Sequence, residues 1–265
     1  MTALRCYVEG IAFWAPSLPG WDVARAAFRG EGGPVDPPLK RPSPDLLAPA
    51  ERRRAPDSVA LALEVAAAAT KDAGRDPKTL ASIFTSAHGD LSVNDYMCTT
   101  LATTPTAISP TRFHNSVHNA AAGYWTIGTG CRAASTALTA FDCSFAAGLL
   151  EAATQCAADG EAVLLVAFDV NATGALASVT ASEGLLAVAL VLAPERGPRS
   201  RTGFEIALRR GPTSPAPLGS DAARALAGNA MADALPFFEA LAATALPPLT
   251  LPLSSSLALR LEPLE

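Results

Sequence analysis

The sequence predicts a layered α/β fold with a sheet rich in parallel strands. Helical and strand patterns alternate along the chain, as in the helix expected over 57–73 and the buried strand expected over 80–86. At 135–148 a run of small and β-branched residues leads directly into residues with helical spacing. The stretch 185–193 is wholly apolar, which is typical of a strand in the middle of a sheet.

The N-terminal part is expected to hold one strand, a long insertion and one helix. Residues 4–14 alternate well enough for a strand, whereas 15–56 are rich in proline and glycine. That composition predicts a long irregular insertion, which is usually functional or faces a partner. The helix after it is expected to be capped by Asp57 or Ser58 and to end at Gly74.

The stretch from Ser135 to Gly148 organises the rest of the chain. Residues 135–141 suit a short buried strand, and a helix is expected from Asp142, which caps it, to Gly160, which ends it. A strand that runs straight into a helix places its turn residues at the positive end of the helix dipole. Such a turn suits a nucleophile or an anion.

The C-terminal part is expected to alternate strands with loops and one helix. No internal repeat or low-complexity tract interrupts this order. The expected elements are a strand over 161–169, a loop over 170–183, strands over 185–193 and 203–209, a linker over 211–219, a helix over 220–243 interrupted by Pro236, and a strand over 249–261.

The composition is that of an acidic globular protein. The chain has 265 residues, is 49% hydrophobic and 17% charged, and carries a net charge of −5. It is not basic enough to predict nucleic-acid binding, and it has no run of 18 apolar residues that would predict a membrane span. Arg5 and Glu9 stand where a signal peptide needs its apolar region, and the five cysteines lack paired spacing. We therefore expect a cytoplasmic protein with reduced thiols.

The sequence lacks the motifs of several other enzyme classes. It contains no G-x-S-x-G, P-loop or dinucleotide G-x-G-x-x-G. His114 and His118 are four residues apart, which is a zinc-ligand spacing, but the glutamate of the zinc-protease signature is missing. We expect no metal and no cofactor on this chain. The histidines are interpreted as polar side chains that buttress the backbone near a subunit interface.

The order of residues from Ile108 to about Ala152 resembles the β-ketoacyl synthases of the thiolase superfamily. That family reads I-S-P, then N-x-x-A-G-x-x-x-I-x-x-G-L-x-G-P-S, then T-A-C-x-S-G. The resemblance implies a thiolase-like layered αβαβα fold, and it continues more loosely through 161–169 and 183–192. The matching residues are Ile108-Ser109-Pro110, Asn119, Ala122-Gly123, Ile127, Gly130, Ser135, Thr139-Ala140 and Ser144.

The resemblance also implies a strongly truncated C-terminal half. A ketosynthase would begin a second βαβ set near residue 211, where this chain has one helix and a terminal strand. We therefore expect a ketosynthase-like N-terminal half over 1–210, with its insertion at 15–56, and a reduced remnant over 211–265, in one compact unit. Serines at 254–256 replace the glycines of the family's final loop, so the backbone there cannot approach a substrate as closely.

The catalytic residues of the family are not found at their positions. In the gapless register the nucleophilic cysteine falls on Asp142, and Cys143 would point about 100° away on a helix. A carboxylate there is a good cap and a poor acceptor of a thioester acyl group. The two histidines of decarboxylating ketosynthases follow the cysteine, whereas His88, His114 and His118 all precede Asp142.

These differences predict a non-catalytic ketosynthase-like subunit, a chain-length factor. The run H-N-S-V-H-N-A-A-A-G-Y-W resembles the small ketosynthase-like proteins of aryl polyene clusters, in fatty-acid or polyketide-type biosynthesis. Such a subunit pairs with an active ketosynthase and shapes its tunnel, and the strand before Asp142 carries the surface through which thiolase-fold dimers pair. The acyl or malonyl phosphopantetheine of a carrier protein would be a ligand of the partner.

The resemblance further implies which residues meet partners. In ketosynthases the counterpart of 91–104 lies by the dimer interface and helps to close the acyl pocket, although Met and Tyr at helical spacing are more often core. Arginines at 52–54 are expected either to form a solvated face or to receive the acidic surface of an acyl carrier protein. The expected residues are Tyr96, Met97, Ser135, Thr139, Phe141, His114 and His118 at the tunnel or interface, and Arg52, Arg53 and Arg54 at the carrier.

Two other functions remain open at this point. One is an acyltransferase or priming condensing enzyme with Cys143 as nucleophile and His114 or His118 as base, because a helix N-terminus lowers the pKa of a thiol. The other is an independent module that binds an acyl carrier or a small molecule. That module would be a stable monomer, whereas a chain-length factor would form a tight heterodimer.

Overall fold

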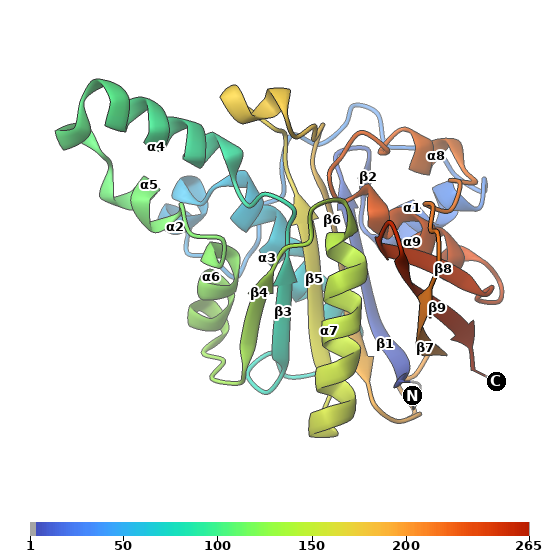
Figure 1. Ribbon diagram of the computed structural model, residues 1–265. Helices are drawn as coiled ribbons and strands as arrows, with labels where there is room; N and C mark the ends of the chain where they lie inside the picture. The colour runs from blue at the N-terminus through green and yellow to red at the C-terminus, as the bar shows by residue number, and fades with distance from the viewer. Residues whose placement is uncertain (1–3, 265) are drawn as a thin grey trace.

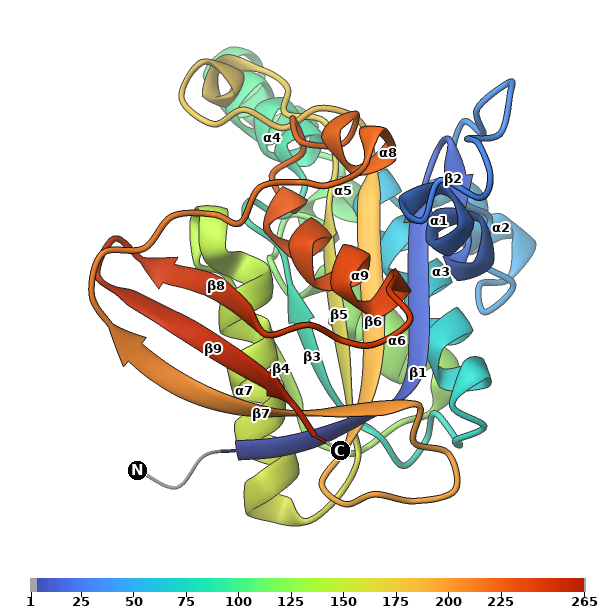
Figure 2. The ribbon, with the colours of Figure 1, turned by 90° about the vertical axis from the view of Figure 1, so that its right-hand side faces the viewer.

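One nine-stranded sheet carries helices on both faces in the computed structural model, which describes residues 4–264 (Figure 1). Its strands are β1 Leu4–Ala15, β2 Leu18–Pro19, β3 Ala81–Thr85, β4 Ser135–Leu138, β5 Val163–Asp169, β6 Leu186–Ala193, β7 Thr202–Arg210, β8 Leu249–Ser254 and β9 Leu257–Pro263. They lie in the order β4-β3-β5-β6-β1-β7-β9-β8, with β2 beside β1. The end formed by β7, β9 and β8 turns away from the other strands (Figure 2).

The prediction of a parallel-rich sheet is wrong. Only β3 runs parallel to its neighbours, β4 and β5, and the other pairings are antiparallel. Parallel neighbours need a crossover connection, usually a helix, and in this sheet only the segment between β3 and β5 supplies such crossovers. The single strand expected over 249–261 is a hairpin of β8 and β9, with its turn at 255–256.

The helices are shorter and more numerous than the sequence suggested. In residues 4–264 they are α1 Trp21–Phe28, α2 Pro49–Arg54, α3 Asp57–Asp72, α4 Leu91–Thr103, α5 Pro110–His114, α6 Ala120–Thr129, α7 Ser144–Asp159, α8 Asp221–Arg224 and α9 Leu235–Ala242. Single 3-10 turns add η1 Pro105–Ala107, η2 Phe141–Cys143, η3 Ala175–Ser178 and η4 Ala232–Ala234. Among these helices none has the length and apolar character needed to cross a membrane.

Two expected elements and the role of Pro236 are corrected. The segment 15–56 is not wholly irregular, because it contains β2, α1 and α2. The single helix expected over 220–243 is divided into α8, η4 and α9. Pro236 lies in the first turn of α9, where its missing N–H breaks no helical hydrogen bond, so this proline begins a helix instead of interrupting one.

Two apolar cores lie on opposite faces of the sheet. The alternation along β5 divides them: Val163 and Leu165 pack in the core that contains α7 and α9, and Leu164 and Val166 pack in the core that contains α3 and α6. Every residue of β5 and β6 is buried, as predicted for 185–193. Each buried valine or leucine side chain stabilises the fold by about 1.5–3 kcal/mol. These fully buried strands form the part of the core against which α7 packs, directly after the turn.

The start of α7 differs from the prediction. Asp142 lies in η2 and is exposed, and it does not cap the helix, which begins at Ser144. The cap comes from Asp233, whose Oδ2 accepts hydrogen bonds from the N–H groups of Phe145 at 2.8 Å and Ala146 at 3.4 Å. The predicted end is confirmed, since Gly160 adopts the left-handed conformation with φ 67°.

The helix α3 also lacks the predicted cap. Pro56 occupies the capping position, and neither Asp57 nor Ser58 bonds the first turn. Ser58 instead donates a hydrogen bond to Oδ2 of Asp90, at 2.8 Å. The predicted stop is in place, because Gly74 has φ 61°.

Asp233 is the acid whose protonation changes most between the folded and unfolded chain. Burial raises its pKa to about 8, the two N–H groups of α7 act in the opposite direction, and Asp169 and Asp142 raise it further. An unfolded aspartic acid has a pKa of about 3.9. The proton held by the folded state therefore stabilises it fully below about pH 4, and that contribution is lost as the pH rises through about 8.

We expect Asp233→Asn to flatten the pH dependence of stability above neutrality. The free energy of unfolding of the wild type should fall by about 1 kcal/mol between pH 7 and pH 9, because the folded state there still holds a proton that the unfolded state has already lost, and the fall levels off as Asp233 ionises. Asparagine keeps an oxygen for the N–H groups of α7 and cannot ionise. Urea unfolding at pH 7, 8 and 9 measures the slope, with Asp159→Asn, an exposed acid at the other end of α7, as a control that keeps it. An equally steep fall in Asp233→Asn would contradict this assignment.

Candidate functional site

The turn between β4 and α7 is held in a strained conformation. Phe141 has φ 49°, and in residues 4–264 it is the one non-glycine residue with positive φ. Such a backbone costs a bulky residue on the order of 1–3 kcal/mol and persists only where its surroundings impose it. Ser144 imposes it here, because its Oγ accepts from the N–H of Ala140 at 3.0 Å and donates to the carbonyl of Phe141 at 2.7 Å. The phenyl ring is 69% exposed.

The strain lies at the residue directly before Asp142, to which the gapless register assigns the position of the nucleophile. In the pattern T-A-C-x-S-G, the residue after Thr139-Ala140 is Phe141, and Asp142 follows it. The turn itself therefore carries a hydrocarbon ring, whereas Asp142 is exposed and Cys143 is half-buried in η2. Phe141 belongs to the expected tunnel or interface residues, but its position at the turn was missed.

The thiol of Cys143 is not activated. Burial raises its pKa, and the carboxyl groups of Asp233 and Asp142 raise it further. Since the thiolate is the nucleophilic form of cysteine, these surroundings oppose reactivity. The two candidate bases are engaged elsewhere: the ring of His114 lies against Tyr124, with centroids 6.0 Å apart, and Nε2 of His118 lies 3.0 Å from the carbonyl oxygen of Ser86.

A buried polar network lies next to the turn, at the ends of β3 and β5. Asp169 accepts hydrogen bonds from Oγ of Ser86 at 2.7 Å and from the N–H of Ala87 at 2.8 Å. Burial raises the pKa of Asp169 to about 6, against the effect of these bonds. From the C-terminal segment, Asn229 donates to the carbonyls of Asp169 and Glu183. The network joins the strand ends to a segment 60 residues away.

The third histidine connects this network to the turn. The ring of His88 lies 6.2 Å from the ring of Phe141, edge to face, and its nitrogens contact Oγ1 of Thr180. Burial lowers the pKa of His88, and Asp142 acts in the opposite direction. Thr139 adds a bond on the other side, from its Oγ1 to the carbonyl of Ala87 at 2.9 Å. His118 thus contacts the backbone just after β3, whereas the ring of His88 lies between Thr180 and Phe141.

The strand β4 is exposed at the edge of the sheet, so the prediction of a buried strand is wrong. Only β3 lies beside it, and its four residues are exposed or half-buried. Ser135 lies at its start, where its Oγ accepts a hydrogen bond from Oγ of Ser82 at 3.0 Å. An edge strand presents unpaired N–H and C=O groups to whatever lies next to it.

Apolar side chains are exposed close to this edge. Phe113, Val117 and Ile127 are 62%, 52% and 81% exposed and line one groove of about 560 Å³. A second hollow of about 460 Å³ contains His118 and Ser135. Asn119 and Gly123 line both hollows, and Figure 1 shows α6 beside β4. We call the surface formed by Ser135–Leu138, Phe113, Val117 and Ile127 the β4–α6 face.

An arm of α4, η1 and α5 projects beyond this face (Figure 1). Tyr96 holds the arm together: its hydroxyl accepts from the N–H of Ser109 at 3.0 Å and donates to the carbonyl of Ala107 at 3.4 Å. The guanidinium of Arg112 lies 4.1 Å from the centre of its ring. Tyr96 is therefore committed to contacts within the arm, and its neighbour Met97 is half-buried.

The three arginines of α2 differ in their surroundings. Arg52 donates to the carbonyl of Leu47 at 3.0 Å and pairs with Asp45 at 3.3 Å, so it is a structural residue. Arg53 is exposed, and Arg54 lines the groove of Phe113. The structure thus brings Arg54, His114 and Phe113 to one groove, and leaves Arg53 on the surface beside it.

Sequence reasoning missed Asp233 and Asn229. Both make hydrogen bonds to residues far away in the sequence, Asp233 to Phe145 and Asn229 to Asp169. No local sequence pattern therefore predicts these bonds. In the sequence Asp169 marks only the end of a predicted strand. An acid that directly follows a buried strand is the signal that could have marked it for closer attention.

Comparison with known proteins identifies the family. The sequence matches the β-ketoacyl synthase N-terminal domain over residues 30–244. The fold is similar to a chain in the complex of the ketosynthase ApeO with its chain length factor ApeC from Xenorhabdus doucetiae, with a TM-score of 0.75 at 22% identity over 98% of this chain and 99% of that one. No curated protein matches the chain.

Two further structures share the fold. One is a chain in the AntDE:AntF complex, in which the acyl-carrier protein of a type II polyketide synthase is bound to its ketosynthase with the hexaketide, with a TM-score of 0.61 at 14% identity over 80% of this chain and 70% of that one. The other is the ishigamide ketosynthase/chain length factor, with a TM-score of 0.61 at 16% identity over 78% and 67%. These structures show a thiolase-like ketosynthase fold. Because the domain match covers most of its length, the chain belongs to the β-ketoacyl synthase family.

Proposed function

We propose that this chain is a non-catalytic chain-length-factor subunit, which pairs with an active β-ketoacyl-ACP synthase and shapes its acyl tunnel. The observation that carries the proposal is Phe141 at the strained turn, because it directly follows Thr139-Ala140, as the cysteine does in the pattern T-A-C-x-S-G. A phenyl ring cannot accept an acyl group. Complexes of a ketosynthase with a chain length factor among the structures of the same fold support this role.

The pairing surface in this proposal is the β4–α6 face. An edge strand can extend the sheet of a partner through its free backbone groups. The exposed rings and aliphatic side chains of Phe113, Val117 and Ile127 supply apolar area beside it, and monomeric proteins rarely leave such clusters uncovered. The occupant we propose is the active ketosynthase, placed so that the two related folds pair about a pseudo-twofold axis.

The tunnel is proposed to lie where the turn and the arm meet this face. Thr139 and Phe141 directly follow β4, His118 and His114 line the two hollows beside it, and Met97 lies on α4 of the arm. Tyr96 would act through the shape of the arm. We place the complex in fatty-acid or polyketide-type biosynthesis of the aryl polyene kind, and in the cytoplasm, for which the five free cysteines are typical.

The second function considered, catalysis by Cys143, has less support. A raised thiol pKa and histidines bound to other groups are the reverse of an activated nucleophile. We therefore propose that the chain has no condensing activity of its own, and that any acyl transfer occurs on the partner.

Ile127→Glu should weaken the pairing with the ketosynthase. Co-expression followed by size-exclusion chromatography with light scattering should give a 1:1 heterodimer for the wild type. In the heterodimer, a glutamate on the β4–α6 face would be buried without a partner of opposite charge. The dissociation constant of the heterodimer should therefore rise on the order of tenfold or more. The matched control is Leu208→Glu, because Leu208 is also an exposed aliphatic residue but lies on β7, away from that face. Equal weakening by both variants would argue against this face.

Cys143→Ala should leave elongation by the complex unchanged. A thiol-directed acyl probe should label the partner's nucleophile and not this chain, because the thiol of Cys143 is held protonated. Mass spectrometry of both subunits locates the label. Acylation of Cys143, with elongation lost in Cys143→Ala, would instead establish this chain as the acyltransferase or condensing enzyme.

Arg53→Glu with Arg54→Glu should weaken the use of an acyl carrier protein. Carrier surfaces are acidic, so reversing two charges should raise KM for the carrier several-fold and leave kcat unchanged. Elongation assays at varied carrier concentration separate the two constants. Arg209→Glu with Arg210→Glu, on the exposed end of β7, changes the net charge equally. The carrier contact is disproved if this control pair raises KM as much.

A further inference from the structure

Two cysteine side chains lie in the core between β1 and α7, far from the strained turn. Cys6 is the third residue of β1, and Cys156 lies in the last turn of α7. Both are fully buried and belong to the same apolar core. Figure 1 and Figure 2 show the start of β1 beside the lower end of α7, whereas the turn at Phe141 leads into the upper end.

The strand register explains why the two thiols are neighbours. Side chains alternate along a strand, so Cys6 and Val8 point to the same face of β1, and Val8 is paired with Leu192 of β6. The thiol of Cys156 reaches the same place, because its Sγ donates to the carbonyl of Leu192 at 3.7 Å. A hydrogen bond joins the side chains of Cys6 and Cys156. The fold thus holds two thiols in contact across a strand and a helix.

The closed fold keeps this pair unreactive. The hydrogen bond with Cys156 and burial raise the pKa of Cys6, and the thiolate is the form that reacts. The ends of strands and helices, however, open more readily than their centres. Since both cysteines lie near such ends, local opening exposes the pair to small solutes without unfolding of the whole chain.

We propose that Cys6 and Cys156 are a modification site, where a small disulfide of the glutathione type converts the two thiols into a disulfide between β1 and α7. One cysteine thiolate attacks glutathione disulfide and displaces one glutathione, which leaves a mixed disulfide on the chain. The other cysteine thiolate attacks this mixed disulfide and displaces the second glutathione. The two hydrogens lost by the cysteines end on the two glutathione molecules. In a reducing compartment the pair remains as thiols, and the bond forms when glutathione becomes oxidised.

The bond would fix the end of α7 whose start is already capped by Asp233. It closes a loop from residue 6 to residue 156, and a long closed loop strongly restricts the unfolded chain. Oxidation should therefore stabilise the fold. The site lies outside the β4–α6 face, so it does not depend on the pairing proposed above.

The other cysteines contact different groups in the part of the chain that the structure describes. Cys98 donates to Oδ1 of Asn94 at 3.3 Å, and Cys131 donates to the carbonyl of Leu80 at 3.4 Å. Cys143 lies before the opposite end of α7. Disulfide formation within the fold is therefore expected for Cys6 and Cys156 and not for these three.

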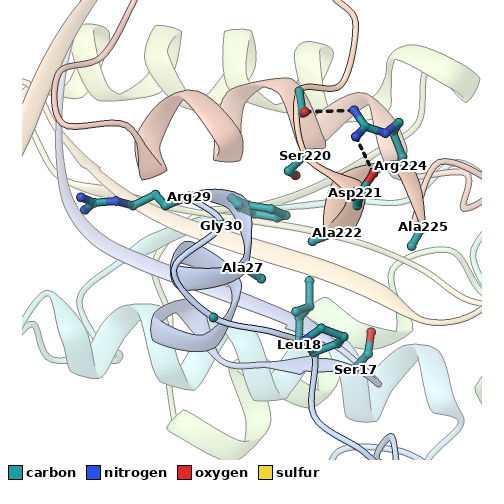
Figure 3. A pocket seen from close by; sticks show the side chains of 14 residues that line it. Ser17, Leu18, Ala27, Arg29, Gly30, Ser220, Asp221, Ala222, Arg224 and Ala225 are labelled. Atoms are coloured by element: carbon teal, nitrogen blue, oxygen red, sulfur yellow. Dashed lines mark hydrogen bonds and ion pairs between the residues drawn. The ribbon is translucent and has the colours of Figure 1, made fainter.

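The hollow of about 610 Å³ between α1 and α8 offers no comparable chemistry (Figure 3). Its two arginines are already paired, Arg29 with Glu31 at 2.8 Å and Arg224 with Asp221 at 2.5 Å. Arg224 also donates to the carbonyls at 218 and 219. These charges are neutralised within the chain, so they do not select a ligand.

Peptide mapping of the full chain tests the proposal. The protein is equilibrated without denaturant in mixtures of glutathione and glutathione disulfide, its remaining thiols are alkylated, and it is digested without reduction. As the share of glutathione disulfide rises, one cross-linked species that joins residues 6 and 156 should appear, while far-UV circular dichroism stays that of the reduced fold. A cross-link between other cysteines, or glutathione adducts without any cross-link, overturns the proposal.

Variants tie the bond and its effect to this pair. Cys6→Ala and Cys156→Ala should each abolish the cross-link, whereas Cys131→Ala, which removes another buried thiol, should keep it. The oxidised wild type should unfold at a higher urea concentration than the reduced wild type, and the same treatment should not shift Cys6→Ala. Urea unfolding of the reduced variants checks that each one folds. An oxidised wild type that unfolds at the same or lower urea, or a cross-link that persists in Cys6→Ala, contradicts a disulfide built into this fold.

Discussion

The cap that Asp233 places on α7 is the interaction on which the site depends. It joins the first turn of α7 to η4, and so ties the strained turn at Phe141 to the C-terminal segment. Gly148 makes the same helix lie close to the sheet, because a Cβ there would stand 2.9 Å from Cγ2 of Thr85. With α7 fixed at its start and along its length, Ser144 can hold the backbone of Phe141 against its intrinsic preference.

Local patterns predicted the buried elements well and the topology poorly. The apolar run at 185–193 became β6, and the helical spacing after 144 became α7, since both signals come from burial along one element. The direction of neighbouring strands and the hairpin at 249–263 depend on how elements are connected and stacked, which periodicity does not record. The burial of β4 was overestimated because sheet order, and not residue type, makes it an edge.

The site was predicted in outline and not in detail. The resemblance drew attention to the stretch that contains β4, the turn and α7, whereas the strained backbone of that turn is at Phe141, one residue before Asp142. The helix caps were predicted wrongly. Aspartate is a favourable capping residue, yet Asp142 does not cap α7, which is capped by Asp233, and Asp57 does not cap α3. A side chain brought in from 88 residues away can replace a local cap, and only the three-dimensional structure reveals it.

The uncovered edge of β4 has a consequence for how a cell can tolerate this protein. A bare strand with apolar neighbours is a template for aggregation, and the chain offers no proline or bulge within β4 to blunt it. Molecules whose β4 edge is left uncovered would aggregate or be degraded. Under the proposed pairing, the amount of this protein that a cell can hold should therefore follow the supply of the subunit that covers this edge, and the two subunits would have to be made in matched quantities.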